Sequence, residues 1–346
     1  MLINQQLSQP MLIPHRPSME GLSQSKQYFC RIMKRYLCLI CLLSALFVSG
    51  RAQQITFAPQ WAPQSQFAGY YAALENGYYA EAGLDVSIEH PTNSYDSMSM
   101  LKDGIANVIT AELIRAMMAT DKEVRLVNLL QTTQHSTLVL VSRIEDVHQM
   151  ADLAGRRVGT WRAGFSEIPY MIDDEQQLGI EWVHFINPLN LYISGAIDAA
   201  LCKSYNEQVF FYMAGITPAS VLRFADMGFD FPEDGLYVTE AFYKKYPEQC
   251  RLFAEASRKG WEWVRNNREE ALKVVMKHVK AAKVPTNVYN QKWMLEAVLQ
   301  EQEDVKGEAP SYSLSVDAFD RLNALLLKHG YISKPVVYNR FVGGNP

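Results

Sequence analysis

The sequence predicts an α/β protein with two lobes and a cleft between them. Short strand patterns alternate with helical patterns from about residue 54 to residue 224, which is typical of helices packed on mostly parallel sheets. A continuous apolar run at residues 137–142 divides the alternation into two series. From residue 239 to about residue 328 the pattern is helical. We therefore expect two βα lobes that are joined by two crossings of the chain and have a cleft between them.

The first series of elements begins directly after an N-terminal leader. Strand patterns cover residues 54–57, 84–88, 106–110 and 125–130, and helical patterns cover residues 67–82, 97–101 and 113–119. Gly83 follows the longest of these helical patterns and is a typical helix end, because glycine adopts the left-handed conformation easily. These elements predict one layered βα lobe.

The second series repeats the alternation. Strands are expected at residues 137–142, 157–161, 182–186, 199–202 and 221–224, with a helical segment at 147–153. Residues 228–235 are expected to form a loop because of their glycine, proline and aspartate content, and residues 236–238 a final strand. The predicted division is a leader at 1–52, lobe 1 at 53–140 plus 236–346, and lobe 2 at 141–235.

Charge excludes nucleic acid as an expected partner. The chain has 33 basic and 37 acidic side chains, a net charge of −4. The first 52 residues contain six of the basic groups and one acidic group, so the remainder has 27 basic and 36 acidic groups and a net charge of −9. Such a body repels phosphate backbones. The composition also excludes disordered and collagen-like proteins.

The leader has the pattern of a secretory signal peptide. Lys34 and Arg35 precede an apolar stretch at residues 36–48, and small residues follow up to Ala52. The stretch is shorter than the roughly 20 residues that a membrane-spanning helix needs, so an export signal is favoured over a retained anchor. We expect translation to start at Met33 and the mature protein to be periplasmic.

No pattern of catalytic or metal-binding residues was found. The seven histidines lack metal-ligand spacing, and there is no nucleophile elbow or phosphate loop. Cys202 and Cys250 are the only cysteines beyond the leader; two buried thiols are favoured over one disulfide. The sequence therefore predicts no catalytic residues, no metal and no cofactor.

Ligands of open α/β sheets bind beyond the carboxyl ends of the strands. The candidates at these positions combine aromatic, amide and carboxylate groups with small residues that expose backbone N–H groups. They are Trp61, Tyr70, Glu112, Trp161, Gly164, Ser166, Tyr205, Asn206 and Glu207.

The aromatic candidates suit a flat ring, and the polar ones suit its edge. Aromatic faces stack on heterocycles, and an amide or carboxylate can accept from an amine beside a ring nitrogen. The alternatives remain open: Tyr70 packs a helix on the sheet, Glu112 interacts with the N-terminus of the following helix, or Glu207 faces solvent at a helix start. Gly164 and Ser166 could instead direct amides at an anion, with Arg162 adding charge.

Several segments resemble a known family. They are Trp61-x-Pro63, Gly69-Tyr70-Tyr71-x-Ala73, Gly77-Tyr78-Tyr79-x-Glu81-x-Gly83-Leu84-Asp85-Val86, Glu89-x-Pro91-Thr92-Asn93, Gly195-Ala196-Ile197-Asp198-Ala199 and residues 237–248. Together they resemble the thiamine pyrimidine-precursor family, NMT1/THI5-like and SsuA-like, of type 2 periplasmic solute-binding proteins. The likeness spans about residues 54–275.

This resemblance implies a type 2 periplasmic-binding-protein fold, with two βα lobes, a two-strand hinge and an interlobe cleft. It implies a solute-binding protein that closes on a thiamine pyrimidine precursor and delivers it to an inner-membrane ABC permease. We expect the protein to be a monomer. It implies that Trp61, Trp161, Tyr205 and Glu207 grip the ring and its edge, with Tyr70 and Glu112 as further candidates. Binders of sulfonate, nitrate or flavin are the alternative within the same superfamily. A strongly anionic ligand would use Arg162 and the amides of residues 164–166.

The family also includes the fungal thiamine pyrimidine synthase, which uses a histidine of its own chain and pyridoxal phosphate held on its own lysine, with iron. Aligning that stretch places Ala111 at the lysine position and Arg115 at the histidine position. The cysteine cluster of the enzyme would fall near residues 228–235, which contain no cysteine. The resemblance therefore implies a binding protein without synthase activity.

Overall fold

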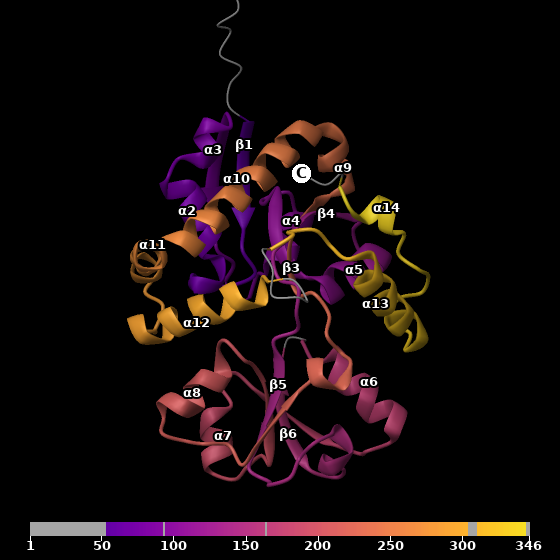
Figure 1. Cartoon of the computed structure of the whole chain (residues 1–346). Helices are drawn as coiled ribbons and strands as arrows, with labels where there is room; N and C mark the ends of the chain where they lie inside the picture. Colours follow the sequence, from indigo (N-terminus) through magenta and orange to yellow (C-terminus); the bar gives the residue numbers. More distant parts are fainter. Residues whose placement is uncertain (1–52, 93, 163–164, 304–309, 344–346) are drawn as a thin grey trace, which may run out of the picture. The chain divides into compact units, whose positions relative to one another are not determined.

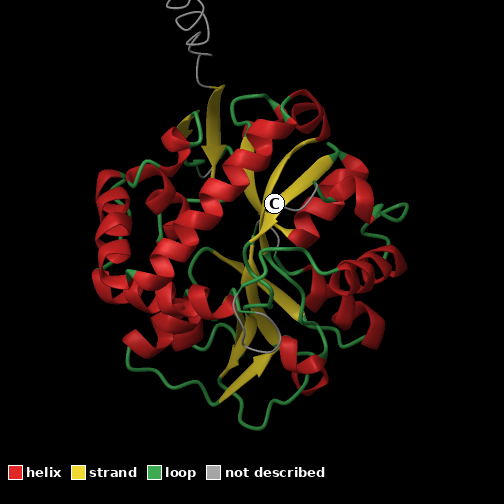
Figure 2. Cartoon of the chain, turned by 45° about the horizontal axis from the view of Figure 1, so that its top comes forward, coloured by secondary structure: helices red, strands yellow, loops and turns green. Residues whose placement is uncertain are grey.

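The computed structural model describes residues 53–92, 94–162, 165–303 and 310–343 (Figure 1). The predicted leader lies outside these residues. The described part contains two five-stranded sheets with helices on both sides of the strands (Figure 2). In the described ranges, no helix combines the length and apolarity needed to cross a membrane.

The first sheet has the strand order β2-β1-β3-β10-β4. Its strands are β1 (Gln53–Ala58), β2 (Leu84–Ile88), β3 (Val108–Glu112), β4 (Leu126–Gln131) and β10 (Asp234–Thr239). Strands β1, β2 and β3 are parallel, whereas β10 is antiparallel to both of its neighbours. We call this sheet with its helices lobe 1.

The second sheet repeats this plan in the order β7-β6-β8-β5-β9. Its strands are β5 (Leu138–Ser142), β6 (Arg157–Trp161), β7 (Glu181–Phe185), β8 (Ala199–Lys203) and β9 (Ser220–Arg223). Strand β5 is antiparallel to β8 and β9, and the other three are parallel. We call this sheet with its helices lobe 2.

The chain crosses between the lobes twice, from β4 to β5 and from β9 to β10. The two crossings contact each other, because His135 Nδ1 lies 2.8 Å from Asp230 Oδ2 and the Ser136 amide donates to Asp230 Oδ1 at 2.8 Å. The predicted lobe boundaries at 140/141 and 235/236 fall inside β5 and β10. The division at those exact residues stays a prediction.

The helices follow the sheets closely. In lobe 1 they are α2 (Ala68–Glu75), α3 (Tyr78–Glu81), α4 (Ser97–Lys102), α5 (Leu113–Lys122), α9 (Glu240–Lys245), α10 (Pro247–Asn266), α11 (Arg268–Ala281), α12 (Val288–Glu301), α13 (Val316–Lys328) and α14 (Tyr338–Phe341). In lobe 2 they are α6 (Glu167–Gln176), α7 (Leu189–Ile193) and α8 (Glu207–Met213). Short 3-10 turns occur at Ser65–Phe67, Met150–Leu153 and Ala225–Met227.

Several expected elements differ from the structure. The helical segment expected at 147–153 is only a short 3-10 turn at Met150–Leu153. The helix expected over 67–82 is interrupted at Gly77, whose φ of 78° is left-handed and ends the first helical segment. The third strand extends to Glu112 instead of ending at residue 110, because the later residues pair with β10. For the same reason β10 begins at Asp234, inside the expected loop.

Close packing of α2 on α10 explains part of the glycine and tyrosine motif (Figure 1). A Cβ on Gly69 would lie 2.2 Å from Cδ2 of Trp261, and a Cβ on Gly260 would lie 2.0 Å from the carbonyl oxygen of Gly69. Tyr70 and Tyr71 next to this contact are buried in the core of lobe 1. The motif therefore provides a helix contact that larger residues would block.

The two cysteines of the described part are free thiols, and both are buried. Cys202 lies in β8 of lobe 2 and Cys250 in α10 of lobe 1. The favoured expectation of two buried thiols is confirmed.

Candidate functional site

Aromatic side chains from both lobes meet at the carboxyl ends of β1 and β6. The ring centroid of Phe165 lies 5.6 Å from that of Trp61 and 6.2 Å from that of Trp161, both in edge-to-face geometry. Trp61 belongs to lobe 1, whereas Trp161 and Phe165 belong to lobe 2. We call these three residues the aromatic cluster. Each such contact contributes about 0.5–1.5 kcal/mol beyond area burial.

Phe165 has an unusual backbone conformation. Its φ is 68°, in the left-handed region that costs a residue other than glycine about 1–2 kcal/mol. The ring contacts on both sides offset this cost. Strain of this kind concentrates at binding and catalytic sites.

Glu207 is fixed in lobe 2 by three donors. Trp161 Nε1 donates to Oε1 at 3.2 Å, Asn206 Nδ2 donates to the same oxygen at 3.1 Å, and the amide of Lys203 donates to Oε2 at 2.9 Å. The structure therefore brings the predicted residues Trp161, Asn206 and Glu207 into one hydrogen-bonded group. The carboxylate lies beside one indole of the aromatic cluster.

The other indole is connected to a second carboxylate through Gln66. Trp61 Nε1 donates to Gln66 Oε1 at 3.0 Å, and Gln66 Nε2 donates to Asp234 Oδ2 at 2.5 Å. With its amide oriented to satisfy both neighbours, Gln60 also donates to Asp234, at 3.3 Å, and accepts from the amide of Glu112, at 2.7 Å. Burial raises the pKa of Asp234 to about 6, against the lowering effect of the Gln66 hydrogen bond.

A buried lysine joins the lobes. Nζ of Lys203, at the end of β8, lies 2.7 Å from Oε1 of Glu112 in lobe 1 and 3.0 Å from Oε2 of Glu233 in the β9–β10 crossing. Burial raises the pKa of Glu112 to about 8; Lys203 opposes this shift and Glu233 adds to it. Burial would lower the pKa of Lys203, but the charges of Glu112 and Glu233 raise it above its usual value.

The remaining predicted residues lie around this centre. Tyr205 is buried against the core of lobe 1, and burial followed by the charges of Asp234, Glu233, Glu112 and Glu207 raises the pKa of its hydroxyl. Ser166 is buried and hydrogen-bonded to Thr160. Gly164 lies outside the described residues.

Tyr70 lies further from the aromatic cluster. Its ring centroid is 4.9 Å from that of Phe57 and 5.7 Å from that of Trp261, and the side chain is buried in lobe 1. This packing agrees with the alternative that Tyr70 anchors its helix on the sheet.

Sequence reasoning missed five residues of this centre, namely Gln66, Phe165, Lys203, Glu233 and Asp234. Phe165 is the one aromatic residue between the candidates Trp161 and Ser166, and Lys203 stands two residues before the candidate Tyr205. Glu233 and Asp234 lie in the segment that was expected to form only a loop. No local pattern distinguishes them, because their partners come from residues far away in the chain.

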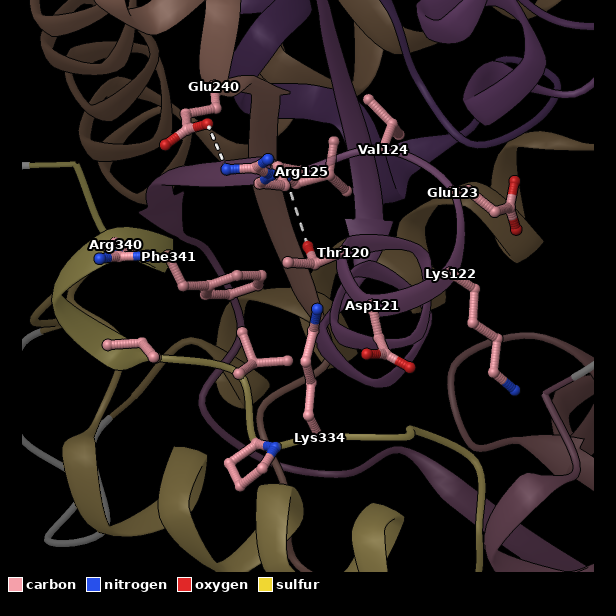
Figure 3. A pocket seen from close by; sticks show the side chains of 14 residues that line it. Thr120, Asp121, Lys122, Glu123, Val124, Arg125, Glu240, Lys334, Arg340 and Phe341 are labelled. Atoms are coloured by element: carbon pink, nitrogen blue, oxygen red, sulfur yellow. Dashed lines mark hydrogen bonds and ion pairs between the residues drawn. The ribbon is translucent and has the colours of Figure 1, made fainter.

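The cavity at this centre is small. About 30 Å³ remains among side chains that include Glu112, Phe165, Lys203 and Glu233, which is about the volume of one water molecule in liquid water. A larger cavity of about 440 Å³ lies in lobe 1 beside α5 and α14, where Arg125 pairs with Glu240 and the side chain of Lys334 points toward Thr120 (Figure 3). None of the candidate residues from the sequence lines that larger cavity.

Comparison with known proteins identifies the family. Residues 64–271 match the family described as NMT1/THI5 like. The chain belongs to this family. It is 24% identical over 323 residues to the formylaminopyrimidine-binding protein of Halalkalibacterium halodurans. This alignment covers 88% of this chain and 97% of that protein.

The chain is also similar to one further related sequence and to a solved structure. The chain is 25% identical over 230 residues to 4-amino-5-hydroxymethyl-2-methylpyrimidine phosphate synthase THI13 of Saccharomyces cerevisiae, covering 61% of this chain and 67% of that protein. The periplasmic aliphatic sulphonate binding protein SsuA of Escherichia coli matches with a TM-score of 0.61 and 12% identity, over 84% of this chain and 97% of that one. The predicted periplasmic-binding-protein fold is confirmed.

The positions aligned with the synthase have structural roles here. Ala111 is buried in β3, and Arg115 on α5 forms an ion pair with Glu167, with Nη1 3.1 Å from Oε1. Within the ranges that the structure describes, no three His, Cys, Asp or Glu side chains are grouped so that they could hold a metal ion.

Proposed function

We propose that this chain is an exported solute-binding protein that holds a thiamine pyrimidine precursor between its lobes and delivers it to an inner-membrane ABC permease. The ring stacks on Trp61 and Trp161, and carboxylates accept hydrogen bonds from its edge. The similarity to the formylaminopyrimidine-binding protein, which extends over 97% of that protein, supports this ligand class. The proposed location is periplasmic, with a signal peptide at 33–52 and a monomeric mature protein.

The proposal depends mainly on the charge of the groups around the aromatic cluster. Four carboxyl groups lie around this centre: Glu112 and Glu233 contact the ammonium of Lys203, whereas Asp234 and Glu207 accept hydrogen bonds from Gln66 and Trp161. Arg162, the cation expected for an anionic ligand, is exposed. A sulfonate or nitrate would be repelled by this surplus of carboxylates, whereas the N–H groups of an aminopyrimidine can donate to them.

Lobe closure is the proposed mechanism. The remaining cavity of about 30 Å³ is too small for a pyrimidine, so the ligand enters while the lobes are apart and Phe165 is displaced. A ligand that contacts both lobes stabilises the closed state by its differential affinity for that state. Because Lys203 already bridges the lobes, closure also joins charges that an open form would expose to water.

Calorimetric titration with an aminopyrimidine tests the proposal. The wild-type protein is expected to bind, and Glu207→Ala is expected to weaken binding tenfold or more, because removing the carboxylate leaves the Trp161 and Asn206 donors unpaired. Glu181→Ala, which removes an exposed carboxylate of β7, is the matched control and is expected to bind as the wild type does.

Two outcomes would contradict the proposal. Binding of a sulfonate that is lost in Arg162→Ala and retained in Glu207→Ala would favour the anion-binding alternative. Conversion of pyridoxal phosphate to a pyrimidine by the purified protein would favour the synthase.

A further inference from the structure

Two buried carboxyl groups are neighbours on adjacent strands of the first sheet. Glu112 of β3 and Asp234 of β10 are direct partners in the antiparallel register, with 5% and 7% of their surfaces exposed. Side chains of direct partners project from the same face of a sheet, where like charges destabilise each other. The pair lies at the end of β3 and at the start of β10, and Glu112 lines the small cavity of the site.

The surrounding groups do not neutralise both carboxylates. Lys203 is shared with Glu233, which is also held by the amide and hydroxyl of Thr137 at 2.8 Å and 2.5 Å. The hydrogen bonds of Asp234 to side chains come from the neutral amides of Gln66 and Gln60. Buried charges without a counterion are costly, so the pair needs protons or a cation.

The charges of this pair also affect two buried tyrosine hydroxyls. Tyr70 and Tyr237 are almost fully buried; the Tyr70 hydroxyl interacts with Thr132 and Trp261, and the Tyr237 hydroxyl with Asn128, which lowers the pKa of each hydroxyl against the effect of burial. The charge of Asp234 adds to the effect of burial in raising the pKa of both hydroxyls, and Glu112 adds to it at Tyr237.

We propose that the Glu112–Asp234 pair is the edge that recognises the ligand, and that the ligand is bound as a cationic nitrogen heterocycle. This inference rests on the proposed function and adds the charge state of the ligand to it. A ring nitrogen that carries a proton beside an exocyclic amine presents two parallel N–H donors, which match carboxylate oxygens. The positive charge replaces the missing counterion.

The proton balance follows from the groups that face Glu112. They are Lys203 of β8, Glu233 of the crossing, Asp234 and Tyr237 of β10, and Tyr205. With a pKa of about 8, Glu112 is protonated at neutral pH when the site is empty. A ligand that binds as a neutral base accepts the proton of Glu112 within the complex, so no proton is exchanged with the buffer. A permanently charged ligand instead displaces this proton into the buffer.

Titration with a permanent cation separates these cases. Calorimetry with benzamidinium, a flat cation that keeps its charge and two parallel N–H donors over this pH range, is repeated in buffers of different ionisation enthalpy and is expected to show release of about one proton near pH 7. Its affinity is expected to rise about tenfold per pH unit up to about pH 8 and then to level off. In Glu112→Gln the release and the pH dependence are both expected to disappear.

Glu301→Gln is the matched control. Burial raises the pKa of Glu301 to about 7, but this carboxyl is on α12, at a groove lined by His135 and Arg223. This variant is expected to keep the proton release of the wild type. Carbon-13 NMR of the empty protein adds a readout that needs no ligand. The carboxyl signal of Glu112 is identified by its absence from the spectrum of Glu112→Gln and is expected to titrate near pH 8.

The outcomes distinguish this inference from the proposed function. Tight binding of 4-aminopyrimidine with equal affinity for its uncharged 4-methyl isostere, or binding of the cation without proton release, would overturn the inference and leave the function intact. Absence of binding for every pyrimidine would overturn the function itself. A Glu112 signal that titrates below about pH 6 in the empty protein would overturn the inference alone.

Discussion

Lys203 shows how one side chain holds charges from different parts of the chain. It is the last residue of β8 in lobe 2, yet its ammonium contacts Glu112 from lobe 1 and Glu233 from the crossing. Because only 7% of the residue is exposed, its charge is compensated almost entirely by protein groups. The interlobe contact therefore depends on this lysine much more than on the exposed ion pairs of the helices.

Replacing Lys203 by methionine tests this role. Lys203→Met leaves the carboxyl groups of Glu112 and Glu233 buried without a cation and is expected to lower the free energy of unfolding by about 3–5 kcal/mol. Lys102→Met removes an exposed pair with Glu123 and is expected to cost about 0–1 kcal/mol. Urea unfolding of both variants measures the difference, and equal losses would contradict the proposed importance of the buried contact.

Among the elements, the contact between α2 and α10 is the most sensitive to side-chain size. Gly69 and Gly260 let the helices approach until the indole of Trp261 covers Gly69. Trp261 also contacts Tyr70, which packs on Phe57 of β1. The helix that follows the Trp61 loop is therefore positioned by α10, an element almost two hundred residues further along the chain.

Gly260→Ala is the corresponding prediction. Its methyl group would meet the Gly69 carbonyl at 2.0 Å, so the helices must separate, and we expect a loss of about 1–3 kcal/mol in the free energy of unfolding. Lys259→Ala on the same helix is exposed and is expected to stay within about 0.5 kcal/mol of the wild type. Thermal unfolding of the two variants compares them, and a stable Gly260→Ala would show that the helices can shift freely.

At the scale of the whole molecule, the buried carboxyl groups link stability to pH. Glu112 has a pKa of about 8 in the folded protein against an ordinary value of 4.5. Between these values the folded state binds more protons than the unfolded state, so stability decreases as pH rises. The contribution is fully present below about pH 4.5 and is lost as pH passes 8.

The expected result is a loss of stability in mildly alkaline solution. Between pH 7 and about pH 8.5 the empty protein is expected to lose up to about 1 kcal/mol in the free energy of unfolding, measured with urea at constant salt. In Glu112→Gln the loss is expected to be smaller, whereas Glu123→Gln, which removes a half-exposed carboxyl, is expected to behave as the wild type. A stability that rises over this interval would contradict the raised pKa of Glu112.

Motifs that resemble a known family indicated the periplasmic-binding-protein fold. The sequence by itself determined the strand and helix alternation and the candidates Trp61, Trp161, Asn206 and Glu207, which are aromatic or polar residues at strand ends. These features are local, because hydrophobic periodicity and strand ends are visible within short windows. Only the tertiary structure decided that Glu112 faces Asp234 and that Lys203 joins the lobes. These contacts connect residues about one hundred positions apart, and their charge states depend on burial, which no local pattern records.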